Sequence, residues 1–228
     1  MIKNISNLGD AAVYCDFGIE INKKINSEVI KYFKAIKEKN IKGINNLTPS
    51  YNKLIISFDL SATNYNTVKG QIEKLDINEA QNNSSKRIEI PVCCDNSFSL
   101  DIERLENILN LTREKILENF FNKEYFCYMT GFIAGMPFLG DLDQNMRAQR
   151  LETPRVKVPK GSVGLTEQFA NIYTFESPGG WNILGNTPLD IFDSSKEKDP
   201  NLINPGDIVI FKQITLDQYR NYNEKKLF

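Results

Sequence analysis

Hydrophobic positions in the first 80 residues follow the order strand, helix, strand, helix. Residues 11–17 have strand composition and end at Gly18. Asn22 can cap the helix that follows, because its side chain can accept from a free backbone N–H of the first turn. The hydrophobic side chains of this helix recur at spacings of three and four: Ile25, Val29, Phe33 and Ile36. A second strand at residues 51–58 and a shorter helix at residues 68–75 complete a small α+β or α/β unit.

The chain turns polar between residues 78 and 86, where an Asn-Asn-Ser-Ser run has the composition of a linker. We therefore place a domain boundary there. Residues 1–84 form the predicted N-terminal α+β domain, and residues 85–228 form a second domain.

The second domain is predicted to be mostly β. An alternating strand at residues 87–92 precedes two short helical patterns, which Ser99 and Thr112 can cap. Beyond them, β-rich pieces alternate with loops rich in glycine and proline, at the intervals expected of a barrel or a sandwich. These pieces cover residues 125–129, 156–158, 172–175, 181–184, 191–192 and 208–211.

Charge and composition disfavour two classes of partner. The 28 Lys and Arg residues nearly balance the 29 Asp and Glu residues, so the net charge is -1 and no overall field draws the chain to nucleic acid or to an acidic membrane. No stretch approaches 18 uninterrupted apolar residues, and the first residues lack the apolar core of a signal peptide. We expect a cytoplasmic protein.

The absence of histidine removes several chemistries from this chain. Ser-His-Asp triads, Cys-His pairs and histidine-bound metals are all excluded, and no metal site is legible. The four cysteines are Cys15, Cys93, Cys94 and Cys127. They include no C-x-x-C pair, so reduced thiols are the simplest expectation.

Three segments rich in glycine and proline carry the candidate chemistry. The first, residues 131–140, has glycines that allow a pocket wall or, equally, a buried turn of a barrel. In the second, Arg155 stands between two prolines, and Arg150 lies one loop earlier. Either arginine can present a fork of donors to a carboxylate or phosphate, although a structural salt bridge is the alternative for each.

The third segment surrounds the single tryptophan. Glu176 is the carboxylate that we expect to transfer protons. Trp181 follows a glycine pair and is either a pocket wall or a core anchor. Ser162 has no histidine to activate it, so we expect it to form hydrogen bonds with substrate and not to attack it. The predicted catalytic residues are therefore Arg155 and Glu176, and the predicted substrate-binding residues are Arg150, Ser162 and Trp181.

These segments together resemble one family. Residues 131–142 correspond to its pattern GFxPGFPYLxGL, residues 150–164 to PRxxTPRxxVPxGSVG, and residues 177–188 to SPGGWxxIGRTP. The chain is thereby similar to the 5-oxoprolinase B subunit family, also described as allophanate hydrolase subunit 1, kinase A inhibitor-like, or carboxyltransferase domain subdomain C/D. The similarity is nearly full length.

The resemblance implies an N-terminal α+β domain followed by a cyclophilin-like β barrel. It implies a heteromeric complex with the A and C subunits of 5-oxoprolinase, of which the C subunit has a related barrel. Such a complex uses ATP with Mg²⁺ to open the lactam of 5-oxo-L-proline, giving L-glutamate. A lactam is a poor electrophile, so phosphorylation of its oxygen would precede attack by water, with cations stabilising the transferring group. Arg150 and Arg155 would serve there or hold the substrate carboxylate.

Several positions depart from the family pattern. Ala134 replaces a proline, Asn186 replaces an arginine, and a Gln-Thr-Gly stretch becomes Phe169, Ala170 and Asn171. The losses remove hydrogen-bond donors from the expected pocket. Either the substrate differs or the reacting groups lie mainly on the partner subunit.

Two further functions remain open alternatives: an inhibitor that binds a sensor histidine kinase, and a component of a urea or allophanate amidohydrolase system. A pocket shared with a partner would need an apolar patch on the exposed rim of the barrel. Met136, Phe138 and Leu139 are the residues predicted for that interface.

Overall fold

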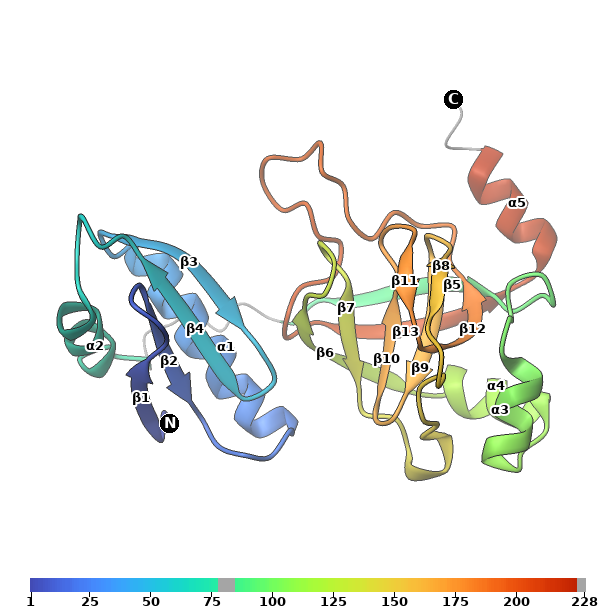
Figure 1. Cartoon of the computed structure of the whole chain (residues 1–228). Helices are drawn as coiled ribbons and strands as arrows, with labels where there is room; N and C mark the ends of the chain where they lie inside the picture. Colours follow the sequence, from blue (N-terminus) through green and yellow to red (C-terminus); the bar gives the residue numbers. More distant parts are fainter. Residues whose placement is uncertain (78–84, 225–228) are drawn as a thin grey trace. The chain divides into compact units, whose positions relative to one another are not determined.

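The computed structural model describes residues 1–77 and 85–224 (Figure 1). The chain divides into two compact units, Met1–Ser84 and Ser85–Phe228, and each is described by itself. Most of the predicted linker, residues 78–84, lies outside the described residues.

The first unit is an antiparallel sheet of four strands with two helices. The strand order is β1-β2-β4-β3. The strands are β1 (Asn4–Asn7), β2 (Ala12–Asp16), β3 (Ile44–Pro49) and β4 (Lys53–Phe58), and the helices are α1 (Lys23–Lys39) and α2 (Tyr65–Glu73). The predicted strands at residues 11–17 and 51–58 and both predicted helices are confirmed. Strands β1 and β3 were not predicted, because their side chains are only partly buried or exposed and show no strong hydrophobic pattern.

Local chemistry explains where α1 begins and how it packs. The Asn22 side chain accepts from the backbone N–H of Ile25 at 2.9 Å, as expected of a cap. Val29 and Ile36 are buried in one core cluster with Leu54 and Ile56 of β4, so the predicted apolar face is the one that meets the sheet. Burial of these side chains is the main source of stability for such a unit.

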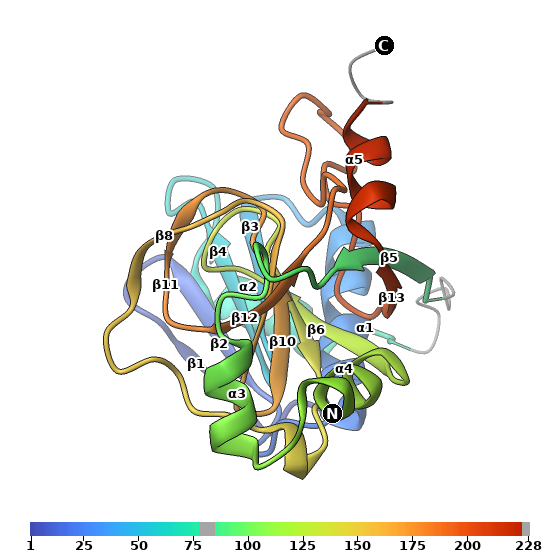
Figure 2. The same cartoon turned by 90° about the vertical axis from the view of Figure 1, so that its right-hand side faces the viewer.

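The second unit is a closed barrel. Its strands follow the order β10-β7-β6-β13-β5-β12-β9 around the barrel, and only β13 and β5 pair in parallel (Figures 1 and 2). The barrel strands are β5 (Arg87–Cys93), β6 (Glu124–Thr130), β7 (Pro137–Gly140), β9 (Ser162–Thr166), β10 (Phe169–Ile172), β12 (Asn182–Asn186) and β13 (Ile208–Ile214). A separate ribbon pairs β8 (Arg155–Val158) with β11 (Ser177–Gly179). The predicted α+β class with a barrel is confirmed.

Short helices are interspersed with the strands of this unit along the chain. They are α3 (Ile102–Leu109), α4 (Arg113–Phe121), the 3-10 turn η1 (Gln144–Met146) and α5 (Leu216–Glu224). Thr112 caps α4 as predicted, but the prediction for Ser99 is wrong, because Asp101 holds the cap position of α3. The hydroxyl of Ser99 instead donates to the Leu184 carbonyl at 2.7 Å.

The strands predicted at residues 87–92, 125–129, 156–158, 181–184 and 208–211 are confirmed as β5, β6, β8, β12 and β13. Strand β9 was missed and β10 was misplaced, because every residue of both is buried and the pattern of alternating polar positions is missing. The strand predicted at residues 172–175 ends at Ile172, and the one at residues 191–192 is only an isolated bridge from Phe192 to Asn201.

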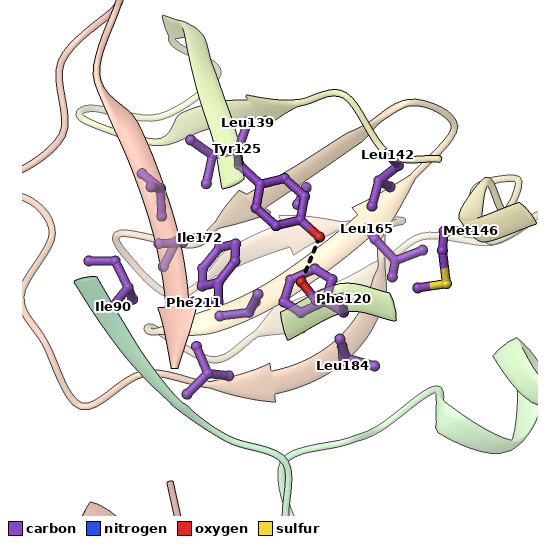
Figure 3. Close-up of a cluster of buried hydrophobic side chains, with 14 of the residues drawn as sticks. Ile90, Phe120, Tyr125, Leu139, Leu142, Met146, Leu165, Ile172, Leu184 and Phe211 are labelled. Carbon is purple, nitrogen blue, oxygen red and sulfur yellow. Dashed lines mark hydrogen bonds between the residues drawn. The ribbon is translucent and has the colours of Figure 1, made fainter. Parts of the chain in front are cut away.

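An aromatic cluster fills one part of the barrel core (Figure 3). The ring of Phe120 lies 4.9 Å from that of Phe211 and 5.3 Å from that of Tyr125, between ring centroids. The Tyr125 hydroxyl donates to the Phe120 carbonyl at 2.9 Å. This carbonyl lies in the last turn of α4, where carbonyls have no partner within the helix. The bond therefore joins the end of a helix to the core.

All four cysteines are free and buried, as expected of reduced thiols. Burial raises the pKa of Cys15 and of Cys94 to about 12, and it raises the pKa of Cys127 as well. No described helix has both the length and the apolar character needed to cross a membrane.

Replacing Tyr125 by Phe should lower the free energy of unfolding by about 1–2 kcal/mol, because the buried Phe120 carbonyl would lose its partner. Urea unfolding of Tyr125→Phe measures this. Tyr222→Phe is the matched control, since Tyr222 is 40% exposed and should change stability little. Equal stability of the two variants would contradict the structural role of the Tyr125 hydroxyl.

Candidate functional site

The β8–β11 ribbon brings two of the three candidate segments together. Strands β8 and β11 lie side by side (Figure 2). In their pairing, Ser177 of β11 faces Val158 of β8, and Gly179 faces Arg155. The backbone N–H of Leu151 also donates to the Gly180 carbonyl at 2.8 Å. The arginine-rich segment and the glycine-tryptophan segment are therefore neighbours along their length.

Arg155 is anchored by a buried carboxylate. Its Nη2 donates to Oδ1 of Asp101 at 2.6 Å, and Asp101 is only 5% exposed. The other carboxylate oxygen of Asp101 accepts from the backbone N–H of Ile183 at 2.7 Å. The structural salt bridge considered for Arg155 thus exists, but it occupies only one end of the guanidinium. The Nη1 atom of Arg155 is buried and has no hydrogen-bond partner.

Asp101 was not predicted as a site residue. It is one acidic residue among several near the start of a short helix, and its partner Arg155 lies 54 positions later in the chain. No local sequence signal distinguishes it, because the contact depends on the fold bringing β8 to the start of α3.

Tyr173 lies against the same ribbon and was also missed. Its side chain is 1% exposed, and a Cβ placed at Gly179 would lie 2.0 Å from its hydroxyl oxygen. Only glycine at position 179 leaves room for that hydroxyl. The glycine pair before Trp181 is the signal that could have found it, since it marks a close approach by another group.

The surroundings of the Tyr173 hydroxyl are rich in hydrogen-bond donors and positive charge. Burial raises the pKa of Tyr173, while the Asn171 amide, the backbone N–H of Trp181 and the charges of Arg150 and Arg155 act in the opposite direction. These four groups favour negative charge near the hydroxyl oxygen. No hydrogen bond of good geometry satisfies the hydroxyl, which is buried.

The other predicted binding residues differ in position. Trp181 is 7% exposed, and its ring packs edge-on against Phe138 with centroids 5.6 Å apart. Ser162 is buried on β9 opposite Asn186 of β12. Arg150 is exposed, and it forms no ion pair with another residue of the described segments 1–77 and 85–224. Of these three, Arg150 and the Trp181 backbone are the groups that act on Tyr173.

The structure does not bring Glu176 to the Arg155 cluster. Its side chain is 56% exposed and pairs with Lys157 at 3.1 Å, and Lys157 is 75% exposed. Such surface pairs are well solvated and have little influence on a buried site. This geometry gives no support to the predicted proton transfer by Glu176.

The predicted partner interface needs correction. Met136 is 1% exposed and Leu139 is fully buried in the barrel core (Figure 3), so neither lies on an exposed rim. Leu139 of β7 belongs to the core of the closed barrel, and Met136 directly precedes that strand. Phe138 is partly exposed, but its ring supports Trp181.

The exposed aromatic residue of this segment is Phe132, which is 69% exposed and has a φ of 70°. Positive φ is unfavourable for a bulky side chain, so the loop holds Phe132 outward at a cost in backbone strain. The same loop contacts two neighbours: Ala134 accepts from the Thr174 hydroxyl, and Gly135 packs on Phe192. Phe175 and Phe192 also contact each other, with ring centroids 5.7 Å apart. We name Phe132, Phe175 and Phe192 the aromatic rim.

The departures from the family pattern have structural roles here. Asn186 donates to the Lys160 carbonyl at 2.9 Å and accepts from the Tyr219 hydroxyl at 2.7 Å, so it joins α5 to the barrel. Phe169 packs against Tyr128 at 5.7 Å between centroids, and Ala170 is buried in the barrel core. Of the positions that differ, only Asn171 touches the site.

No group of three or more potential metal-ligating side chains occurs among the described residues. A hollow of about 410 Å³ lies elsewhere on the barrel unit, where β5 and β13 end and α5 begins. Its lining includes Cys93, Asp95 and Gln218 but none of the predicted site residues. We assign the site by the converging polar groups around Tyr173, because an open hollow without them has no chemistry of its own.

Replacing Arg155 by Ala should lower the free energy of unfolding by about 2 kcal/mol, because the buried Asp101 carboxylate would lose its charged partner. The effect is smaller than for a fully buried pair, since Arg155 is 28% exposed. Arg155→Lys keeps a positive charge near Asp101 and is the matched control. Urea unfolding measures both. No difference between the two variants would show that the ion pair contributes nothing to stability.

Comparisons with known proteins agree with the resemblance. The model of the carboxyltransferase domain, subdomain C and D, matches residues 3–203. The B subunit of the 5-oxoprolinase of Bacillus subtilis is 33% identical over 233 residues, covering 97% of each chain. The crystal structure of TTHA0988 has a TM-score of 0.81 at 26% identity over 90% of this chain, which spans 40% of that longer chain.

A more distant structure shares the fold alone. The Kluyveromyces lactis urea amidolyase has a TM-score of 0.75 at 20% identity, over 95% of this chain and 15% of that one. The family model covers most of the chain, and a full-length relative agrees with it. The chain therefore belongs to the family of the carboxyltransferase domain, subdomain C and D.

Proposed function

We propose that the chain is one component of an ATP-dependent 5-oxoprolinase, which hydrolyses 5-oxo-L-proline to L-glutamate together with the A and C subunits of that enzyme. The observation that carries this proposal is the full-length similarity to a protein named as the B subunit of 5-oxoprolinase. The second support is a cluster of cations and donors around Tyr173, which suits an anionic substrate.

The chain is proposed to bind and orient, and to be inactive alone. It has no histidine, and Glu176 pairs with Lys157 at the surface. The carboxylate beside Arg155 is Asp101, whose two oxygens are already bonded to Arg155 and to the Ile183 backbone N–H. Arg155 and Arg150 supply positive charge that can hold a carboxylate or stabilise a transferring phosphoryl group. The remaining reacting groups are proposed to come from the partner subunits.

ATP with Mg²⁺ is proposed to bind mainly to a partner subunit. The sequence contains no phosphate-binding loop motif, and the described residues provide no cluster of carboxylates for a metal. These residues do not fit a nucleotide and metal site of their own, so we derive no step of the reaction from such a site here. A cytoplasmic location is proposed, in keeping with four free cysteines.

Coupled assays of the three subunits test the proposal. ATP hydrolysis and glutamate release from 5-oxo-L-proline should appear only when this chain is mixed with both the A and C subunits. Arg155→Lys should reduce turnover by about tenfold or more, because lysine cannot reproduce the second donor end of the guanidinium. Lys157→Met, which removes an exposed cation of the same strand, should leave turnover unchanged.

A stable complex that releases no glutamate would overturn the proposed reaction. Direct binding of this chain to the dimerisation domain of a sensor histidine kinase would then favour the inhibitor alternative. Turnover of urea or allophanate by the mixture would favour the amidohydrolase alternative.

The aromatic rim is proposed to contact the C subunit, because a complex needs an exposed apolar surface and Phe132 is held outward there. In calorimetry, Phe132→Asp should bind at least about tenfold more weakly to the C subunit. Ile19→Asp is the control, since Ile19 is 92% exposed in the other unit and should not affect binding. Unchanged affinity of Phe132→Asp would reject the rim as the contact.

A further inference from the structure

Two buried donors near the β8–β11 ribbon lack an acceptor. They are the Nη1 group of Arg155 and the hydroxyl of Tyr173, and neither has a hydrogen-bond partner. The Ser177 hydroxyl of β11 and the Asn171 amide oxygen are buried and unpaired as well. Leaving one such group unpaired away from water costs about 1–3 kcal/mol, and more for a charged group. Buried polar groups are usually paired, so two unpaired donors in one place need an explanation.

The neighbours of Tyr173 show which kind of group is missing. The Asn171 amide, the Trp181 backbone N–H and the two arginines all stabilise negative charge at the hydroxyl oxygen. The hydroxyl itself stays protonated, because burial opposes its ionisation. The cluster thus presents donors and positive charge, and what would complete it is an acceptor with negative charge.

The fold holds these donors in place before any ligand binds. Asp101 occupies only the Nη2 end of Arg155, which leaves Nη1 free at a fixed position. Gly179, opposite Arg155 in the ribbon, leaves the space that the Tyr173 hydroxyl occupies. Preorganised donors of this kind bind an anion without the cost of ordering them first.

The cluster lies close to the surface of the unit. The Arg155 side chain is 28% exposed, although its Nη1 atom is buried. Arg150 is exposed and close enough to act on Tyr173. It can attract an anion toward the buried donors.

We propose that Tyr173 and Arg155 form a subsite for the carboxylate group of a small acid. The Tyr173 hydroxyl donates to one carboxylate oxygen and Nη1 of Arg155 donates to the carboxylate from the other side. Arg150 attracts the anion from the surface. The identity of the acid as 5-oxo-L-proline rests on the proposed function, but the carboxylate subsite does not.

The single tryptophan of the chain allows a direct test. The Trp181 side chain begins beside Asn171, because a Cβ placed at Gly164 would lie 3.1 Å from the Trp181 Cβ and 2.9 Å from the Asn171 Oδ1. Its fluorescence is therefore expected to respond when a ligand binds at Tyr173. The full chain is titrated with 5-oxo-L-proline, with acetate, and with 2-pyrrolidinone, which has the same lactam ring without the carboxylate. The two carboxylates should change the fluorescence saturably and compete with each other, whereas 2-pyrrolidinone should not bind.

Variants separate a binding role from a structural one. Tyr173→Phe should weaken carboxylate binding about tenfold, the loss expected for one hydrogen bond to a charged group, with little change in thermal midpoint. Arg155→Lys should weaken it at least as much and keeps a charge near Asp101. Tyr222→Phe is the control and should bind as the unmodified chain does.

Three results would overturn the subsite. The first is binding of 2-pyrrolidinone as tight as that of 5-oxo-L-proline, and the second is no binding of either carboxylate. The third is a Tyr173→Phe variant that is less stable but binds unchanged, which would show that the hydroxyl donates to the Asn171 amide oxygen and has only a structural role. Carboxylate binding without glutamate release by the three subunits would leave the subsite standing while rejecting the proposed reaction.

Discussion

The carboxylate of Asp101 is the contact on which the arrangement of the site depends. One oxygen holds Arg155 of the β8–β11 ribbon, and the other accepts from the backbone of Ile183 in the barrel wall. Asp101 also stands at the cap position of α3. A single buried side chain thus joins a helix start, a barrel strand and the ribbon. Charge-assisted bonds of this kind fix direction as well as distance, which is why only one end of the guanidinium remains available.

Close packing completes what the ion pair begins. Gly179 has no side chain, so the Tyr173 hydroxyl can lie against the ribbon next to Arg155. The ring of Phe138 supports Trp181, whose backbone N–H lies near the same hydroxyl. Glycine and aromatic residues that belong to separate motifs of the sequence therefore all surround the Tyr173 hydroxyl. Since protein interiors are close-packed, a change at any of these positions is expected to move the others.

The structure explains most of the departures from the family pattern by the contacts that these residues make. Asn186 is bonded at both ends of its amide, to Lys160 and to Tyr219, so it is part of the framework. Phe169 and Ala170 fill the barrel core. Asn171 alone among them lies beside Tyr173. Most of the altered positions therefore change the framework of the barrel, and only Asn171 changes the polar groups of the site.

The sequence pattern predicted the elements that have one buried and one exposed face. Helix α1 has one buried and one exposed face, and its cap at Asn22 is a local interaction. The helix and its cap were therefore both predictable from the sequence. The strands β9 and β10 are buried throughout, so they show no alternation of polar and apolar residues from which they could be predicted. Burial of Leu139 and of Met136 in a closed barrel likewise follows from the pairing of distant strands. Their predicted exposure was wrong for that reason.

The residues of the candidate site also divide into those that the sequence predicted and those that only the fold revealed. Residue type and spacing were enough to select Arg155 and the glycine pair. An arginine can donate two hydrogen bonds to one anion, and a glycine leaves room for another group to approach closely. Asp101 and Tyr173 were not selected, since each acts only through a partner far away in the chain. The sequence by itself therefore determined the family, the class of fold and which cation to examine. Only the tertiary structure decided which groups meet that cation, because hydrogen bonds and close packing depend on distances that strand pairing alone creates.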